Sequence, residues 1–180
     1  MSIITRTAIL LLLSVTPLFA QAQDAPKHPA PAPRPLTVDI INAKGQTVGS
    51  ATLSEAEHGV KIKLDIRSMP PGAHLMHIHE FAVCEPPDFK SAGAHFNGAA
   101  GNHAEHGPMG MTAGDIPNFV LTVAADGTAH TSVIAPYVSL GAESNSVFSN
   151  GGTSLVFHAV ATQVSASAPP RIACAVISRP

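Results

Sequence analysis

Two histidines stand two residues apart in the segment His77-Ile78-His79, which reads as part of a strand. Residues two apart in a strand point to the same face, so both imidazoles can reach one metal ion. The pair alone is a weak signal, because two solvated histidines give the same pattern. His158 strengthens it, since it stands in a late apolar run where an imidazole needs a polar partner. With His95 in the intervening loop, these residues predict a metal site made of imidazole nitrogens.

The segments that must position these histidines are predicted to be short strands. Residues 60–66 alternate strictly between apolar and charged side chains, as a half-buried strand does. The turn sequences Lys44-Gly45 and Asp126-Gly127 separate further apolar runs, and no stretch has convincing helical periodicity. The expected strands are residues 36–41, 47–53, 60–66, 73–80, 118–124, 128–134, 155–160 and 172–177.

Short strands with one polar face each predict an all-β fold of two stacked antiparallel sheets. The chain has no tryptophan, one tyrosine, 14 glycines and 16 prolines, which argues against a helical bundle and for strands joined by turns. Residues 81–116 do not alternate and are rich in glycine, proline, asparagine and histidine. A loop of that length inside a compact domain is usually functional.

The composition of the 180-residue chain indicates one globular domain, with 45% hydrophobic and 12% charged residues and a formal net charge of -2. Ten basic against twelve acidic residues exclude the strongly basic surface of a nucleic-acid-binding protein. No apolar run reaches the ~18 residues that a permanent membrane span needs. The sequence does not determine the oligomeric state.

Residues 1–22 are predicted to be a signal peptide, with Arg6, a following apolar run and the small-x-small tripeptide Ala20-Gln21-Ala22. The apolar run is too short for a stable transmembrane helix, although an N-terminal anchor is the alternative. Residues 23–35 are rich in proline and alanine and predict an extended linker, so the domain is expected to comprise residues 36–180. The expected location is the periplasm or the cell exterior.

Cys84 and Cys174 are the two cysteines of the chain. An exported protein meets an oxidising compartment, in which paired thiols form disulfides. We therefore expect one bridge between them, with two unrelated buried thiols as the alternative.

Five segments, in the same order along the chain, resemble motifs of the copper/zinc superoxide dismutase family. The resemblance implies an eight-stranded Greek-key β-sandwich or flattened barrel with long metal-binding loops, a fold of which this family is an established example. It also implies copper-dependent dismutation of superoxide to dioxygen and hydrogen peroxide. The segments are residues 72–81 (GAHLMHIHEF), 91–97 (SAGAHFN), 113–119 (AGDIPNF), 153–159 (TSLVFHA) and 171–177 (RIACAVI).

The same resemblance assigns a role to individual residues. It implies that His77, His79 and His158 bind copper and that His95 bridges copper and zinc. His95 would leave copper on reduction and accept a proton, which makes it the general acid of the second half-reaction. Arg171 would attract and orient the superoxide anion.

The zinc half of the resemblance is incomplete. His95, His103 and Asp115 match the family's zinc ligands, but Thr112 stands where the family has a further histidine. Threonine is a poor zinc ligand, and His106 is either its substitute or a solvated loop residue. Zinc is therefore expected to bind weakly or not at all. Without zinc, neighbours such as Asp115 would have to orient His95.

A second departure follows the last copper motif. The family has a charged loop there, with an aspartate that links copper and zinc ligands. This chain has Thr162 at that position, and residues 159–170 carry no charge. The loss of such a carboxylate is expected to loosen the zinc half further.

The histidine set also fits a different function, because the same scaffold could retain copper for storage or delivery without catalysis. Arg171 distinguishes the two hypotheses, since a copper store needs no cation beside its metal. The sequence therefore favours the enzyme over the binding protein.

Overall fold

The computed structural model describes residues 34–98, 111–159 and 169–179, which belong to one compact unit, Ala32–Pro180. The predicted signal peptide and nearly all of the predicted linker lie outside the described residues, as do His103, His106 and Thr162. In the described part of the chain, no helix has the length and apolar character that crossing a bilayer requires.

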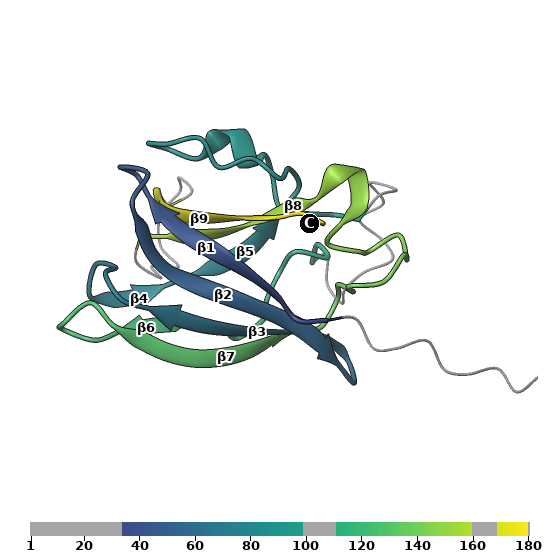
Figure 1. Cartoon of the computed structure of the whole chain (residues 1–180), viewed down its shortest axis with the longest axis horizontal. Coiled ribbons are helices and arrows are strands. Elements are labelled where there is room, and N and C mark those ends of the chain that lie inside the picture. The colour runs from purple at the N-terminus through teal and green to yellow at the C-terminus, as the bar shows by residue number, and fades with distance from the viewer. Residues whose placement is uncertain (1–33, 99–110, 160–168, 180) are drawn as a thin grey trace, which may run out of the picture. The chain divides into compact units, whose positions relative to one another are not determined.

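Most of the described strands form one antiparallel sheet of seven strands, and the other two form a small second sheet (Figure 1). The order β5-β8-β9-β1-β2-β3-β7 places strands side by side that are distant in sequence, as a crossover topology requires. The strands of the large sheet are β1 (Leu36–Asn42), β2 (Thr47–Ala56), β3 (Gly59–Ile66), β5 (Met76–His79), β7 (Ala129–Ala135), β8 (Thr153–His158) and β9 (Arg171–Ile177). The small sheet pairs β4 (Gly72–His74) with β6 (Leu121–Val123).

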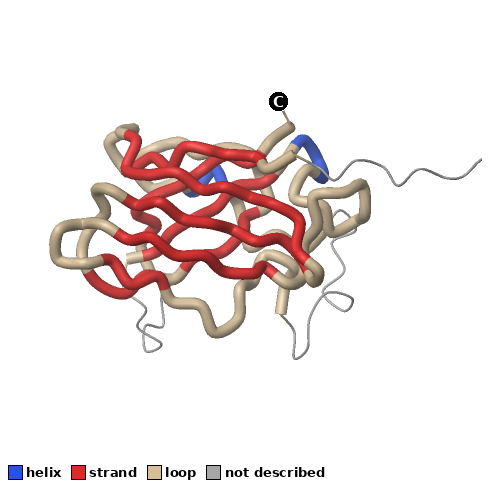
Figure 2. Tube along the Cα trace, turned by 60° about the horizontal axis from the view of Figure 1, so that its bottom comes forward, coloured by secondary structure: helices blue, strands red, loops and turns tan. Residues whose placement is uncertain are grey.

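The large sheet curls around an apolar core, and β3 illustrates why (Figure 2). Lys61 and Lys63 are exposed on its outer face, as the alternating pattern predicts. A slip of one residue in the pairing of β3 would expose its whole apolar set, so the hydrophobic pattern fixes the register. The apolar side chains of β3 are all fully buried: Val60, Ile62, Leu64 and Ile66.

The expected all-β fold class is confirmed, with one difference in the strand that carries the paired histidines. The single strand expected over residues 73–80 is two strands, β4 and β5, separated at Leu75. β4 pairs with β6, whereas β5 pairs with β8. The described residues therefore contain nine strands instead of eight. The break escapes a pattern argument because the backbone changes its partner without interrupting the alternation of side chains.

In the described part of the chain, the loops contain two short 3-10 helices, η1 (Lys90–Ala92) and η3 (Ser149–Gly151). The loop with η1 covers the outer face of β8 and β9, where Phe89 and Ala92 are buried against Val156 and Cys174. Every residue of β8 is buried as a result, because the core covers one face and this loop covers the other.

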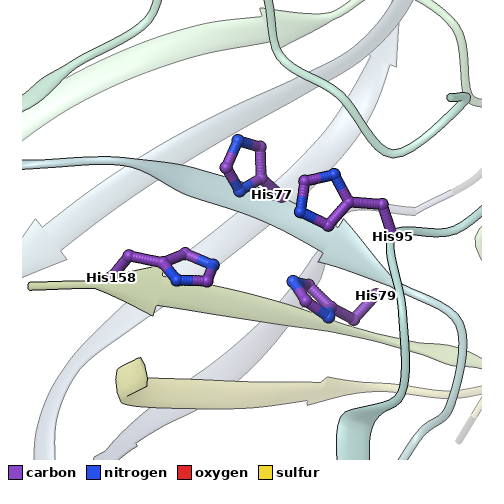
Figure 3. Close-up of side chains that lie close together, drawn as sticks. All are labelled: His77, His79, His95 and His158. Atoms are coloured by element: carbon purple, nitrogen blue, oxygen red, sulfur yellow. The ribbon is translucent and has the colours of Figure 1, made fainter. Parts of the chain in front are cut away.

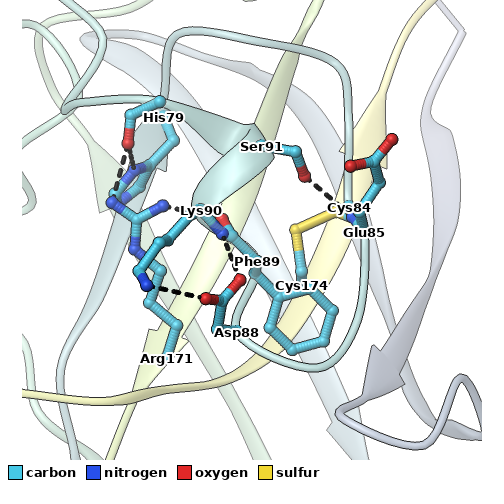
Figure 4. Close-up of a disulfide and its surroundings, with 10 residues drawn as sticks. His79, Cys84, Glu85, Asp88, Phe89, Lys90, Ser91, Arg171 and Cys174 are labelled. Carbon is cyan, nitrogen blue, oxygen red and sulfur yellow. Dashed lines mark hydrogen bonds and ion pairs between the residues drawn. A yellow bond between two sulfur atoms is a disulfide. The ribbon is translucent and has the colours of Figure 1, made fainter.

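A disulfide between Cys84 and Cys174 joins this loop to β9, with the Cα atoms 5.7 Å apart (Figure 4). The predicted bridge is confirmed, and the alternative of two unrelated thiols is excluded. The bridge fixes the covering loop over the part of the sheet that lies next to the histidines.

Removing the bridge is expected to destabilise the protein. The two cysteines are separated by 90 residues. A crosslink across so long a loop lowers the conformational entropy of the unfolded chain, which raises the free energy of unfolding by up to about 4 to 5 kcal/mol. A Cys84→Ala/Cys174→Ala variant should therefore have a lower free energy of unfolding in a denaturant titration. Mass spectrometry of unreduced wild-type protein should find the two cysteine peptides linked. Free thiols at both positions in native material would contradict the assignment.

Candidate metal centre

Four histidines converge beside the large sheet: His77, His79, His95 and His158 (Figure 3). One ring nitrogen from each lies within 4.8 Å of the others, so a single ion can reach all four. The structure thus brings together the whole predicted copper set, from two strands and one loop. Four imidazole nitrogens are a suitable environment for copper.

β5 places the first two histidines by its alternation. Met76 and Ile78 point into the core, with 1% and 0% of their surface exposed. His77 and His79 therefore share the opposite face. The neighbouring strand β8 supplies the third histidine. His79 pairs with Ser154 near the start of β8, and His158 is the last residue of that strand.

Backbone hydrogen bonds place His95, although it lies in a loop. Residues 94–96 run along the edge of β5 that does not pair with β8. There Phe96 donates its N–H to the carbonyl of Ile78 at 2.9 Å, and Glu80 donates to Ala94 at 3.0 Å. His79 and His95 consequently form an antiparallel bridge. The loop is thus held to the strand as an additional, very short strand would be.

The hydrogen bonds of the rings determine which nitrogens face the centre. His79 donates Nδ1–H to the carbonyl of Gly93 at 3.0 Å, and His158 donates Nδ1–H to the carbonyl of Pro169 at 3.1 Å. A carbonyl only accepts, so Nε2 of each ring retains its lone pair. Both Nε2 atoms, and Nδ1 of His77, are buried without a hydrogen-bond partner among the described residues. Such atoms are costly unless something binds them, and a metal ion fits.

The environment keeps these rings neutral, which is the form that binds metal. Burial, followed by the neighbouring imidazoles, lowers the pKa of His77 to about 4. Burial is also the main cause that lowers the pKa of His79 to about 3, and it lowers the pKa of His158. At neutral pH these three histidines are therefore uncharged before any metal binds.

This depression predicts how the stability of the metal-free protein depends on pH. Between about pH 6.5 and 4 the unfolded chain binds protons at these histidines and the folded chain does not, so the free energy of unfolding should fall as the pH falls. Urea titrations across this range should give a weaker pH dependence for His79→Gln. His130→Gln is the matched control, because His130 is an exposed surface residue. Equal slopes in His79→Gln and wild type would contradict this explanation.

Arg171, at the start of β9, is held beside the histidines by two backbone carbonyls (Figure 4). Its Nη1 donates to Phe89 and its Nη2 to Gly93, both at 2.7 Å. Gly93 also accepts from His79, so one carbonyl links the guanidinium to the metal centre. Because both acceptors are neutral, these bonds fix the guanidinium without neutralising its charge. The sequence did not predict the roles of Phe89 and Gly93, because both residues act through their backbone carbonyls and not through a side chain.

A surface hollow of about 410 Å³ adjoins this arginine. Asp88, Lys90 and Arg171 line it together with Pro87, Pro169 and Pro170. The ammonium of Lys90 pairs with the carboxylate of Asp88 at 2.9 Å. Arg171 differs from Lys90, because the guanidinium of Arg171 donates to two uncharged carbonyls instead of a carboxylate.

Of the residues predicted to bind zinc, the structure describes His95 and Asp115. His103 and His106 lie outside the described residues. Asp115 accepts a hydrogen bond from Nδ1 of His95 at 2.7 Å through Oδ1, and one from the backbone N–H of Thr112 at 2.7 Å through Oδ2. Burial raises the pKa of Asp115, but these hydrogen bonds outweigh it and hold the pKa below its usual value.

The described residues contain part of the predicted zinc site. A zinc ion is almost always held by four ligands when it has a structural role. The described residues offer His95 and Asp115, and these two are bonded to each other. The copper half, by contrast, presents converging nitrogens with free lone pairs.

Comparison with known proteins agrees with this geometry. Residues 47–177 match the family model of copper/zinc superoxide dismutase (SODC). The chain belongs to the copper/zinc superoxide dismutase family. Membership in this family implies copper and zinc as metals.

Individual relatives extend the match over most of the chain. "Superoxide dismutase [Cu-Zn] 1" of Aquifex aeolicus is 39% identical over 165 residues, which are 88% of this chain and 91% of the relative. The crystal structure of a double mutant of a superoxide dismutase-like protein from Bacillus subtilis has a TM-score of 0.68 at 33% identity, and the match covers 79% of this chain and 97% of that one. Cu/Zn superoxide dismutase from Brucella abortus has a TM-score of 0.60 at 30% identity, with coverage of 81% and 100%.

Proposed function

We propose that the protein is a copper-dependent superoxide dismutase that acts in the periplasm or outside the cell. The observation that carries the proposal is the position of a fixed arginine next to a cluster of free imidazole nitrogens. Gly93 joins the two, because its carbonyl accepts from both His79 and Arg171. A cation held beside a redox metal suits a small anionic substrate.

His77, His79, His95 and His158 are the residues that would hold copper. The chemistry supplied by a bound copper ion is one-electron transfer, from one superoxide anion and then to a second. Two superoxide anions and two protons thereby give one dioxygen and one hydrogen peroxide. The rings of His79 and His158 stay oriented throughout, because their Nδ1 atoms are bonded to backbone carbonyls.

Two residues act on the substrate and the proton. Arg171 would draw the anion to the centre and orient it. Its guanidinium is held in place because both terminal nitrogens, Nη1 and Nη2, donate to carbonyls of the covering loop. His95 would take up a proton when copper is reduced and then deliver it to the reduced substrate as general acid. Its Nδ1 is occupied by Asp115, so Nε2 is the nitrogen available for this task.

The proposed organisation comprises a signal peptide over residues 1–22, a linker over residues 23–35 and the dismutase domain over residues 36–180. The disulfide between Cys84 and Cys174 supports an oxidising compartment, since cytosolic thiols are kept reduced. Superoxide would then be met outside the cytoplasm.

Titration of the metal-free protein with Cu(II) tests this function. The rate of superoxide decay should rise linearly with added copper and stop rising at one copper per chain. A protein that binds one copper and leaves the decay rate at its background value would instead be a copper-binding protein. That outcome would contradict the enzyme.

A further inference from the structure

We infer that Glu80 is a positioning residue for Arg171 and His79, and that it acts through the peptide unit between Gly93 and Ala94. The part of this inference that concerns catalysis rests on the proposed function and deepens it. The carbonyl of Gly93 accepts from Nδ1 of His79 at 3.0 Å and from Nη2 of Arg171 at 2.7 Å. The orientation of this one peptide unit therefore determines where both side chains are held.

Glu80 holds the same peptide unit from its other side. The N–H of this unit belongs to Ala94, and it donates to Oε1 of Glu80 at 3.2 Å. Because the N–H and C=O of a trans peptide lie in one plane and point in opposite directions, fixing the N–H also fixes the direction of the carbonyl. A carboxylate that accepts the N–H polarises the peptide, which strengthens its carbonyl as a hydrogen-bond acceptor. Glu80 is thus linked through one peptide to both His79 and Arg171.

The peptide unit after Gly93 needs such a contact, because the backbone ladder does not hold it. The peptide units on either side are held, since Phe81 donates its N–H to the carbonyl of Ala92 at 3.1 Å and Glu80 donates its N–H to the carbonyl of Ala94 at 3.0 Å. Gly93 itself has φ 79° and ψ -152°, a conformation that glycine adopts readily and other residues rarely do. The side chain of Glu80 therefore supplies the contact that restrains rotation of this unit.

Glycine at position 93 is also what lets the carboxylate approach. A Cβ atom on Gly93 would lie 2.6 Å from both Cγ and Oε1 of Glu80, so the side chain of Glu80 occupies the space that a larger residue would fill. Glu80 directly follows His79, the last residue of β5, and is half-buried. Both terminal nitrogens of Arg171 donate to carbonyls, so Glu80 reaches this cation through the peptide and not through an ion pair.

The guanidinium of Arg171 in the metal-free protein gives the first readout. In wild type its Nη1 and Nη2 groups donate to two different carbonyls, so ¹H–¹⁵N NMR should resolve them as separate signals. Glu80→Met keeps a side chain of similar length but has no oxygen to accept the N–H of Ala94, so the two signals should broaden or merge. Glu80→Gln should resemble wild type, because its amide oxygen can accept that N–H. Merged signals in wild type, or resolved signals in Glu80→Met, would overturn the inference.

The dismutation rate of the copper-loaded protein gives the second readout. Glu80→Met and Glu80→Gln remove the same negative charge, so comparing them separates the hydrogen bond from the charge. Glu80→Met should keep its copper and be slower by about twofold to tenfold, the range for one lost hydrogen bond. Its rate should also depend less on ionic strength, whereas Glu80→Gln should restore most of the wild-type behaviour. Glu57→Ala is the control, because Glu57 is an exposed acidic residue in the turn between β2 and β3.

A double variant shows whether the effect on the rate passes through Arg171. Adding Glu80→Met to Arg171→Ala should lower the rate little further, because the first residue acts through the second. Additive losses, or equal losses in Glu80→Met and Glu80→Gln, would overturn the inference. Glu80→Ala repeats both readouts if thermal unfolding shows that Glu80→Met does not fold. A copper-loaded wild type without dismutase activity would instead contradict the proposed function, and the NMR readout, which needs neither copper nor superoxide, would still decide the role of Glu80.

Discussion

Replacing His79 with alanine is expected to abolish both copper binding and superoxide dismutation. His79 is 1% exposed, and its free Nε2 faces the three other imidazoles. Alanine removes one of four nitrogen ligands and also releases the carbonyl of Gly93 from its bond to the ring. Copper stoichiometry and the visible copper absorption should both fall to the background level, together with the rate of superoxide decay.

The control for this variant is His130→Ala, which removes an exposed histidine from β7. It should retain one copper and the wild-type rate. Thermal unfolding of both variants will show whether the fold is intact. One copper per chain with a normal spectrum in His79→Ala would mean that the centre is assigned wrongly.

Replacing Arg171 with alanine is expected to lower the dismutation rate by about tenfold or more while copper stays bound, because electrostatic steering of this kind contributes about 10-fold to 1000-fold. The effect should be large because the chain has a net charge of -2 and because residues 159–170 carry no charge that could guide the anion. The rate of wild type should fall with ionic strength, and the rate of Arg171→Ala should depend on it less.

Arg67→Ala is the matched control for charge, since Arg67 is an exposed arginine that contacts Asp65. It should leave the rate and its salt dependence close to wild type. Pulse radiolysis across ionic strength measures all three proteins. An Arg171→Ala protein with normal copper content and the wild-type rate would remove the catalytic role of this arginine.

Side-chain patterns predicted the parts of the molecule that alternation controls. The common face of His77 and His79 follows from a period of two, and the structure has it because Ile78 between them is in the core. The same argument extended the strand through Leu75, where the backbone changes from one sheet to the other. It also overestimated residues 118–124, which form a strand only over Leu121–Val123.

Backbone contacts explain what the sequence could not predict. The carbonyl of Gly93 accepts hydrogen bonds from both His79 and Arg171. The pattern of side chains in the sequence does not predict where a backbone carbonyl lies. The resemblance to the family predicted zinc beside His95. It also predicted that neighbours such as Asp115 would have to orient His95 if zinc were absent. The direct bond between these two residues depends on the turn at Thr112, and only the folded chain brings that turn into place.

The central claim, that this centre is catalytic, is tested most directly by pulse radiolysis with superoxide in large excess over copper-loaded wild-type protein. An enzyme should remove superoxide in repeated cycles, with a first-order decay whose rate is proportional to protein concentration and constant over successive pulses. A protein that only stores copper would consume about one superoxide per copper and then stop. Decay that ends at this stoichiometry would contradict the account.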